Sequence, residues 1–218
     1  MDPQQRLLLE RGYEALHGGG LERQALEGSV TGVFLGIAAM DYAEVLKVSP
    51  AGRSVYAATG SSNSIASGRI SFVLGLQGPC ASYDTACSAA LTAFHAACRA
   101  AQLRECVTGL VLGVNLMLLP GVGLSFAIAG MTSALGRSHT FDGRADGYAR
   151  AEACGAVAVS AGAATDTKAA RGSAVRQDGK SASLTAPSGQ AQQALLTAAL
   201  ADAATAPSQL TLNEAHGT

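Results

Sequence analysis

The chain has 218 residues, enough for one good-sized core, and its 15 Lys and Arg against 16 Asp and Glu give a formal net charge of −1. The basic residues are scattered, there is no Trp, and only 5% of residues are aromatic, so we expect no nucleic-acid interface. The chain has five widely spaced cysteines: Cys80, Cys87, Cys98, Cys106 and Cys154. No two of them form a Cys-x-x-Cys pair and no histidine clusters with them, which favours reduced intracellular thiols over disulfides or a metal site.

Strands and helices are expected to alternate along the chain. In chain order we expect a helix at 4–16, a strand at 30–37, a helix at 62–74, a strand at 80–86, a helix at 88–101, strands at 107–113 and 153–160, a helix at 190–204 and a short strand at 210–213. The helix at 88–101 is apolar almost all round, so it should be buried on every side. This alternation predicts an α/β fold with mainly parallel strands and helices on both faces.

Residues 107–131 contain no charged side chain and are long enough to span a bilayer. Pro120 and five glycines interrupt them, however. A buried strand at 108–113, a loop and a short apolar helix therefore account for this segment better than a membrane span. The first residues, Met1-Asp-Pro-Gln-Gln-Arg, do not have the pattern of a secretory signal peptide. We expect a cytoplasmic protein without a membrane span, and an organelle such as a plastid is also compatible.

Cys87 stands at the joint between a strand-like run and an Ala-rich helix. Backbone N–H groups at a helix start have no intrahelical partner and carry partial positive charge, which favours the nucleophilic thiolate. Cys87 on a rigid helix therefore has the features of a catalytic nucleophile. Free cysteines are also common as small core residues, and the residues alone leave both interpretations open.

The other polar candidates favour structural roles. His95 shares the helix of Cys87, but eight residues along a helix is ~12 Å, too far for a hydrogen bond. His17 borders a Gly run and is expected to be exposed, and His139 is expected to be structural. Asp142 and Asp146 each precede a glycine, which is typical of turns rather than of an acid–base pair.

The segment Asp84-Thr-Ala-Cys-Ser-Ala-Ala-Leu91 resembles the active-site signature of β-ketoacyl synthases, the ketosynthase domains of polyketide and fatty-acid synthases. The family's usual form has serines at the positions of Ala89 and Ala90. Further segments resemble this family in the same order along the chain: residues 2–10, 33–37, 41–42, 60–64, 66–71, 74–79, 115–118, 140–142, 146–150, 177–187 and 214–218.

This resemblance implies a thiolase-like layered α-β-α-β-α fold that is incomplete, with the first half and the start of the second half present. Residues 1–160 would belong mostly to the N-terminal half and residues 161–218 to the start of the C-terminal half. Residues 161–168 look shortened relative to the family. Arg150-Ala-Glu-Ala153 departs from the usual Arg-Gly-Glu-Gly, and its alanines would add strain if the backbone there has positive φ.

The resemblance also implies a function and its site. Cys87 would accept an acyl chain from the phosphopantetheine of an acyl carrier protein. That chain would then join a malonyl-type thioester by decarboxylative Claisen condensation. His216, in Glu214-Ala-His-Gly-Thr218, would stabilise the enolate. No cofactor or metal would be bound directly, and the full-length parent would be a homodimer.

Some family features are missing and keep alternatives open. The second catalytic histidine, a nearby lysine and a C-terminal Gly-rich loop do not occur within the 218 residues. We therefore expect a fragment that is inactive in condensation as given. A non-catalytic ketosynthase-like subunit or truncated pseudoenzyme, acting as a dimerisation module, is the main alternative. A thiolase or hydrolase on the same fold would fit the cysteine but not the segment at 214–218.

Overall fold

A computed structural model describes residues 1–162 and 169–216. The chain divides into two compact units. The first unit comprises Met1–His139 and Arg144–Ala161, and the second comprises Thr140–Gly143 and Gly162–Thr218. The expected shortening at 161–168 falls almost entirely on residues outside the described ones.

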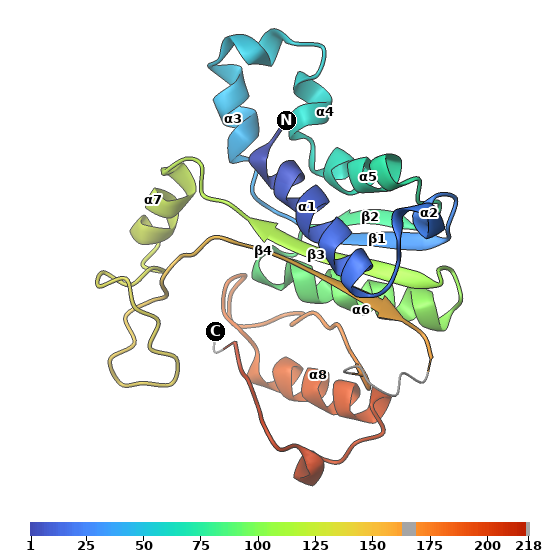
Figure 1. The fold of residues 1–218 in the computed structure, drawn as a ribbon. Helices are drawn as coiled ribbons and strands as arrows, with labels where there is room; N and C mark the ends of the chain where they lie inside the picture. Colours follow the sequence, from blue (N-terminus) through green and yellow to red (C-terminus); the bar gives the residue numbers. More distant parts are fainter. Residues whose placement is uncertain (163–168, 217–218) are drawn as a thin grey trace. The chain divides into compact units, whose positions relative to one another are not determined.

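The first unit is built on a four-stranded sheet with the order β2-β1-β3-β4 (Figure 1). Its strands are β1 (Thr31–Gly36), β2 (Cys80–Tyr83), β3 (Thr108–Asn115) and β4 (Ala153–Ser160). β1 pairs in parallel with β2 and β3, and β4 pairs antiparallel with β3. The central strand β1 is buried along its whole length, as its apolar sequence predicts.

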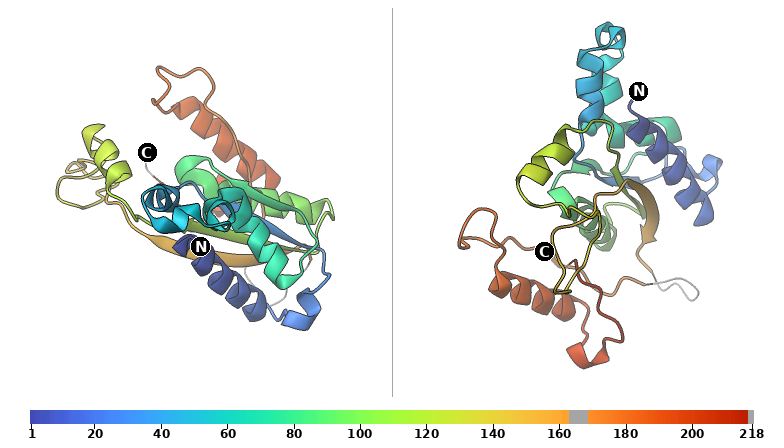
Figure 2. Two further views of the ribbon diagram at one scale, coloured as in Figure 1. Left: turned by 90° about the horizontal axis from the view of Figure 1, so that it is seen from above. Right: turned by 90° about the vertical axis from the view of Figure 1, so that its left-hand side faces the viewer.

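Helices cover both faces of this sheet, as expected (Figure 2). On one face lie α1 (Pro3–Gly18) and α5 (Asn63–Leu74), and on the other lies α6 (Ala89–Gln102). Strand residues alternate between two cores. The core beneath α1 and α5 contains Val33, Leu35, Leu110 and Leu112, together with Leu8, Leu16 and Ile70. The core beneath α6 contains Phe34 and Val111, together with Ala93, Ala97 and Ala100.

Shorter elements complete the two units. The first unit also contains α2 (Arg23–Leu26), α3 (Asp41–Lys47), η1 (Pro50–Arg53), α4 (Ala57–Ser61), η2 (Ala86–Ser88) and α7 (Gly121–Ile128). The second unit contains α8 (Gly189–Asp202) and η3 (Pro207–Gln209). α8 begins after Ser188, whose hydroxyl accepts a hydrogen bond from the Ala191 N–H at 3.3 Å, the usual N-cap arrangement.

Two expectations about these elements are wrong. The helix at 88–101 is not buried on every side, because α6 packs one face on the sheet and leaves Leu91 73% exposed. The expected strand at 210–213 is absent from the described structure. The chain forms η3 just before these residues and is irregular within them, because residues 210–213 pair with no strand among the described residues and so complete no hydrogen-bonded ladder.

The segment at 107–131 folds as β3, a loop and α7, as expected, and none of the described helices is long and apolar enough to cross a membrane. The strain considered for Ala151 and Ala153 does not arise. The non-glycine residues with positive φ, among those described, are Ala86, Arg104, Phe141 and Ala204.

Candidate functional site

Cys87 lies in η2, the single turn between β2 and α6, and its side chain is exposed. Local hydrogen bonds shape this turn. The Asp84 carboxylate accepts from the Ala86 N–H at 3.1 Å, and the Ser88 hydroxyl donates to the Thr85 carbonyl at 2.9 Å. Ala86 has a φ of 53°, in the left-handed region that alanine rarely adopts. Cys87 is therefore not a core residue, and the chain holds it on a constrained turn at the start of a helix.

The first turn of α6 lies unusually close to the sheet because glycines face it. A Cβ added at Gly36 of β1 would lie 2.5 Å from the Ala90 backbone nitrogen, and one at Gly113 of β3 would lie 2.9 Å from the Ala90 Cβ. Further along the helix, a Cβ at Gly109 would lie 3.0 Å from the Ala97 Cβ. Small residues on the strands and on α6 therefore allow the helix that follows Cys87 to pack closely against the sheet.

Gly36→Ala should lower the free energy of unfolding by about 2–3 kcal/mol, because the new methyl group meets helix backbone that cannot rotate away. Gly155→Ala is the matched control, since Gly155 is also a strand glycine and a Cβ there meets nothing within 4 Å. It should change stability by less than about 0.5 kcal/mol. Chemical denaturation of both variants measures the difference, and equal losses would contradict the close seating of α6.

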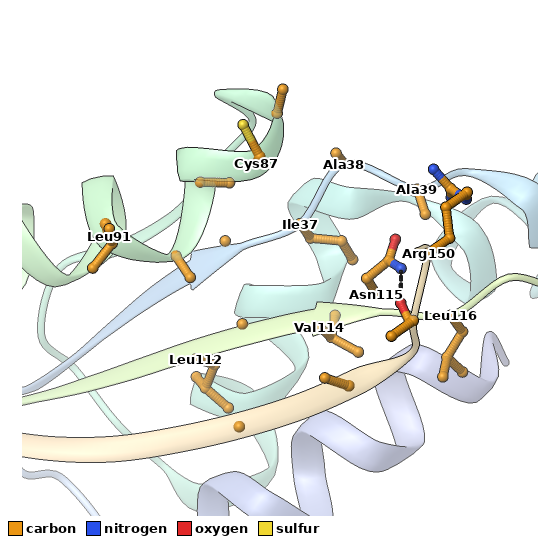
Figure 3. Close-up of a pocket in the computed structure, with 18 of the residues that line it drawn as sticks. Ile37, Ala38, Ala39, Cys87, Leu91, Leu112, Val114, Asn115, Leu116 and Arg150 are labelled. Atoms are coloured by element: carbon orange, nitrogen blue, oxygen red, sulfur yellow. Dashed lines mark hydrogen bonds between the residues drawn. The ribbon is translucent and has the colours of Figure 1, made fainter. Parts of the chain in front are cut away.

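A cavity of about 1120 Å³ opens beside Cys87, within the first unit. It lies where the carboxyl ends of β1 and β3 meet the start of α6, the usual ligand-binding edge of parallel strands. Figure 3 shows Cys87 at the start of the helix ribbon and Ile37, Ala38 and Ala39 on the neighbouring loop. Most of the lining is apolar, which suits a hydrocarbon chain better than a polar metabolite.

Polar groups of the lining hold loops in place. The Asp41 carboxylate accepts from the N–H groups of Leu118 and Leu119, both at 3.0 Å. The Asn115 amide donates to the Ala151 carbonyl at 3.1 Å (Figure 3). These bonds connect the loops that follow β1 and β3 and the segment that precedes β4.

Arg150 is the cationic group of the lining. Its guanidinium lies over the Phe126 ring, 4.9 Å from the centroid, and donates to the Tyr148 hydroxyl at 3.4 Å. This cation–π contact places α7 beside the cavity.

The remaining candidates lie elsewhere. His216 belongs to the second unit and is exposed, so its role beside Cys87 stays a prediction. His95 is half-buried on α6 and is not among the residues that line the described cavity. His17 is exposed as expected, with its ring 5.9 Å from the ring of Tyr13, and His139 is half-buried.

The cysteines differ in their surroundings. Cys80 and Cys87 are exposed, whereas Cys106 is buried and Cys154 half-buried. Burial raises the pKa of both the Cys106 and the Cys154 thiols above the ordinary value, so these two remain protonated to higher pH than a free cysteine. Their burial and raised pKa values make them poor nucleophiles.

Sequence reasoning missed the residues that hold the cavity loops in place, above all Gln4, which is not part of the lining, and Asp41, which is. A signal for Gln4 was present, because Gln4 stands four residues before Leu8 and eight before Gly12, on the same face of the helix as these buried positions. Polar side chains at helix positions that face the core are uncommon unless they are fully hydrogen-bonded.

Comparisons with known proteins agree with this geometry. The profile of the β-ketoacyl synthase N-terminal domain matches residues 1–163, and that of the β-ketoacyl synthase C-terminal domain matches residues 168–218. The whole chain is 45% identical to polyketide synthase GfsA of Streptomyces halstedii and covers 3% of it. It is 42% identical to polyketide synthase GfsB of the same organism and covers 4% of that protein.

Solved structures show the same fold. The ketosynthase from module 6 of the bacillaene synthase of Bacillus subtilis 168 superimposes with a TM-score of 0.87 at 34% identity, and this chain covers 38% of it. The oxazolomycin ketosynthase domain OzmH KS7 of Streptomyces albus JA3453 gives a TM-score of 0.90 at 36% identity, with 39% covered. The first unit thus supplies α-β-α layers of a thiolase-like fold. The chain belongs to the β-ketoacyl synthase family.

Proposed function

We propose that the protein is a β-ketoacyl synthase of polyketide or fatty-acid biosynthesis that uses Cys87 as its nucleophile. The observation that carries this proposal is the position of Cys87. In a chain of this family, an exposed cysteine begins a tightly seated helix and opens onto a large apolar cavity. A non-catalytic dimerisation module would need neither the cysteine nor the cavity. We therefore favour the enzyme over this alternative.

The first half-reaction is acyl transfer. The Cys87 thiolate attacks the carbonyl of an acyl thioester and forms a new C–S bond. The original C–S bond then breaks, and pantetheine leaves as a thiolate that takes up a proton. The backbone N–H of Cys87 is one donor for the negative charge on the tetrahedral oxygen. The apolar lining beside Cys87 receives the acyl chain.

The second half-reaction is decarboxylative condensation. A malonyl-type thioester loses CO₂, and the electron pair of the broken C–C bond forms an enolate. His216 donates a hydrogen bond from Nε2–H to that enolate oxygen. The nucleophilic carbon then attacks the Cys87 thioester, a C–C bond forms, and the thiolate leaves.

Partners follow from this chemistry. Acyl and malonyl-type groups arrive on the phosphopantetheine of an acyl carrier protein, and no cofactor is bound directly. We further propose a homodimer located in the cytoplasm. Residues 1–160 would supply mostly the N-terminal half of the domain and residues 161–218 the start of its C-terminal half.

Alkylation tests the nucleophile. Iodoacetamide or cerulenin should modify Cys87 about tenfold faster than Cys80, because only Cys87 stands at a helix start beside the cavity. Cys80 is the internal control, since it is also exposed and lies seven residues earlier. Peptide mass spectrometry of the natural protein gives both rates. Equal rates would contradict an activated Cys87.

A further inference from the structure

A buried amide at the start of α1 joins the two loops that wall the cavity. Gln4 is 1% exposed. Its Nε2 donates to the Ala39 carbonyl and to the Asp2 carboxylate, both at 3.3 Å, and its Oε1 accepts from the Leu116 N–H at 3.2 Å. Ala39 follows β1 and Leu116 follows β3, so one side chain connects segments that lie 77 residues apart.

Both connected residues line the cavity. Ala39 and Leu116 are cavity residues, and Gln4 itself is not. In Figure 3 the two residues lie on the loops that continue β1 and β3 past the ends of the strands. The loops are joined a second time nearer the surface, where Asp41 accepts from the N–H groups of Leu118 and Leu119. The Gln4 side chain is buried, which limits competition by water for its amide.

Gln4 is held in turn by its own helix start. Asp2 is 2% exposed and caps α1, with its carboxylate accepting from the Gln4 backbone N–H at 2.8 Å. The second carboxylate oxygen accepts from the Gln4 side chain. This arrangement orients the amide so that its donor faces one loop and its acceptor faces the other.

We propose that Gln4 is a positioning residue for the acyl chain, acting through Ala39 and Leu116. The inference rests on the proposed function of the cavity. Without Gln4 the half-buried Ala39 carbonyl and Leu116 N–H would each lose this hydrogen-bond partner, and no side chain would hold the two loops at a fixed distance at this point. The acyl chain would then bind a less ordered wall, while Cys87, carried by η2 and α6, would keep its place.

The neighbouring Gln5 provides a matched control. It is 2% exposed and also makes three side-chain hydrogen bonds, donating to the carbonyls of Thr59 and Ser62 and accepting from Arg69. Those partners are not among the residues that line the large cavity. Gln4→Met and Gln5→Met therefore remove equivalent buried networks, but only the first network touches the cavity wall.

The test uses the natural protein with two measurements. Hydrogen exchange of peptides covering residues 37–41 and 115–119 reports loop order. Acylation of Cys87 by hexanoyl-pantetheine, followed by intact mass, gives the half-saturating thioester concentration and the limiting rate. Gln4→Met should speed exchange in both peptides and raise the half-saturating concentration about tenfold, with the limiting rate within about twofold. Gln5→Met should leave all of these within about twofold.

Gln4→Asn keeps the test decisive if Gln4→Met does not fold. Its amide remains beside Asp2 but is one methylene shorter and cannot reach both the Ala39 carbonyl and the Leu116 N–H, so exchange should rise in at least one of the two loop peptides. Equal behaviour of the Gln4 and Gln5 variants in both measurements would overturn the inference. Failure of the unmodified protein to acylate Cys87 would instead overturn the proposed function, and the exchange data would still decide whether Gln4 orders the loops.

Discussion

Cys87→Ala should lower acyl transfer on the order of 10⁴-fold or more, because the variant has no atom that can form the acyl thioester. The fold should be retained, since Cys87 is exposed and its side chain is not part of either hydrophobic core. The measurement is the mass of the intact protein after incubation with an acyl-pantetheine thioester. The natural protein should gain one acyl group, and the variant should gain none.

Cys80→Ala is the control for this loss. Cys80 is the other exposed cysteine among those described, and it lies on the edge strand β2. Its removal should leave acyl transfer within about twofold of the natural protein. An acyl group that persists in Cys87→Ala and disappears in Cys80→Ala would show that Cys80 is the nucleophile and refute the proposed site.

His216→Ala should separate the two half-reactions. We expect release of CO₂ from a malonyl-pantetheine thioester to fall about 10²- to 10³-fold, the usual effect of removing one donor to a developing oxyanion. Acylation of Cys87 should be preserved, because that step uses the thiolate and backbone donors. The two rates are measured separately, as labelled CO₂ released and as acyl group gained.

His139→Ala is the matched histidine control and should change neither rate by more than about twofold. A parallel fall of acylation and CO₂ release in His216→Ala would indicate a structural role for His216. Unchanged CO₂ release would remove His216 from the proposed mechanism.

The local elements of this chain could be predicted because each has its own pattern. β1 is a continuous apolar run, and α5 and α6 are rich in small and apolar residues. The expected positions of these three elements agree with the structure to within one or two residues. The residues around Cys87 also predicted a strand–turn–helix joint, since turn and helix propensities are local properties. The resemblance of Asp84–Leu91 to the ketosynthase signature then indicated the family that the comparisons show.

Features that depend on distant parts of the chain were not predictable in the same way. The one-sided burial of α6 did leave a signal in the sequence, because Thr92, His95, Arg99 and Gln102 recur at helical spacing and mark a polar face opposite the buried alanines. The segment at 210–213 has a strand-like composition, but a strand forms only where a partner completes its hydrogen bonds.

The amino-acid sequence by itself determined the candidate nucleophile, the order of most of the strands and helices, and the family, because these follow from short contiguous patterns. Only the tertiary structure decided how Cys87 is presented. Gly36 and Gly113 let α6 approach the sheet, and Gln4 joins the loops after β1 and β3. These contacts join residues far apart in the chain, and no local propensity encodes which backbone group a buried amide will meet.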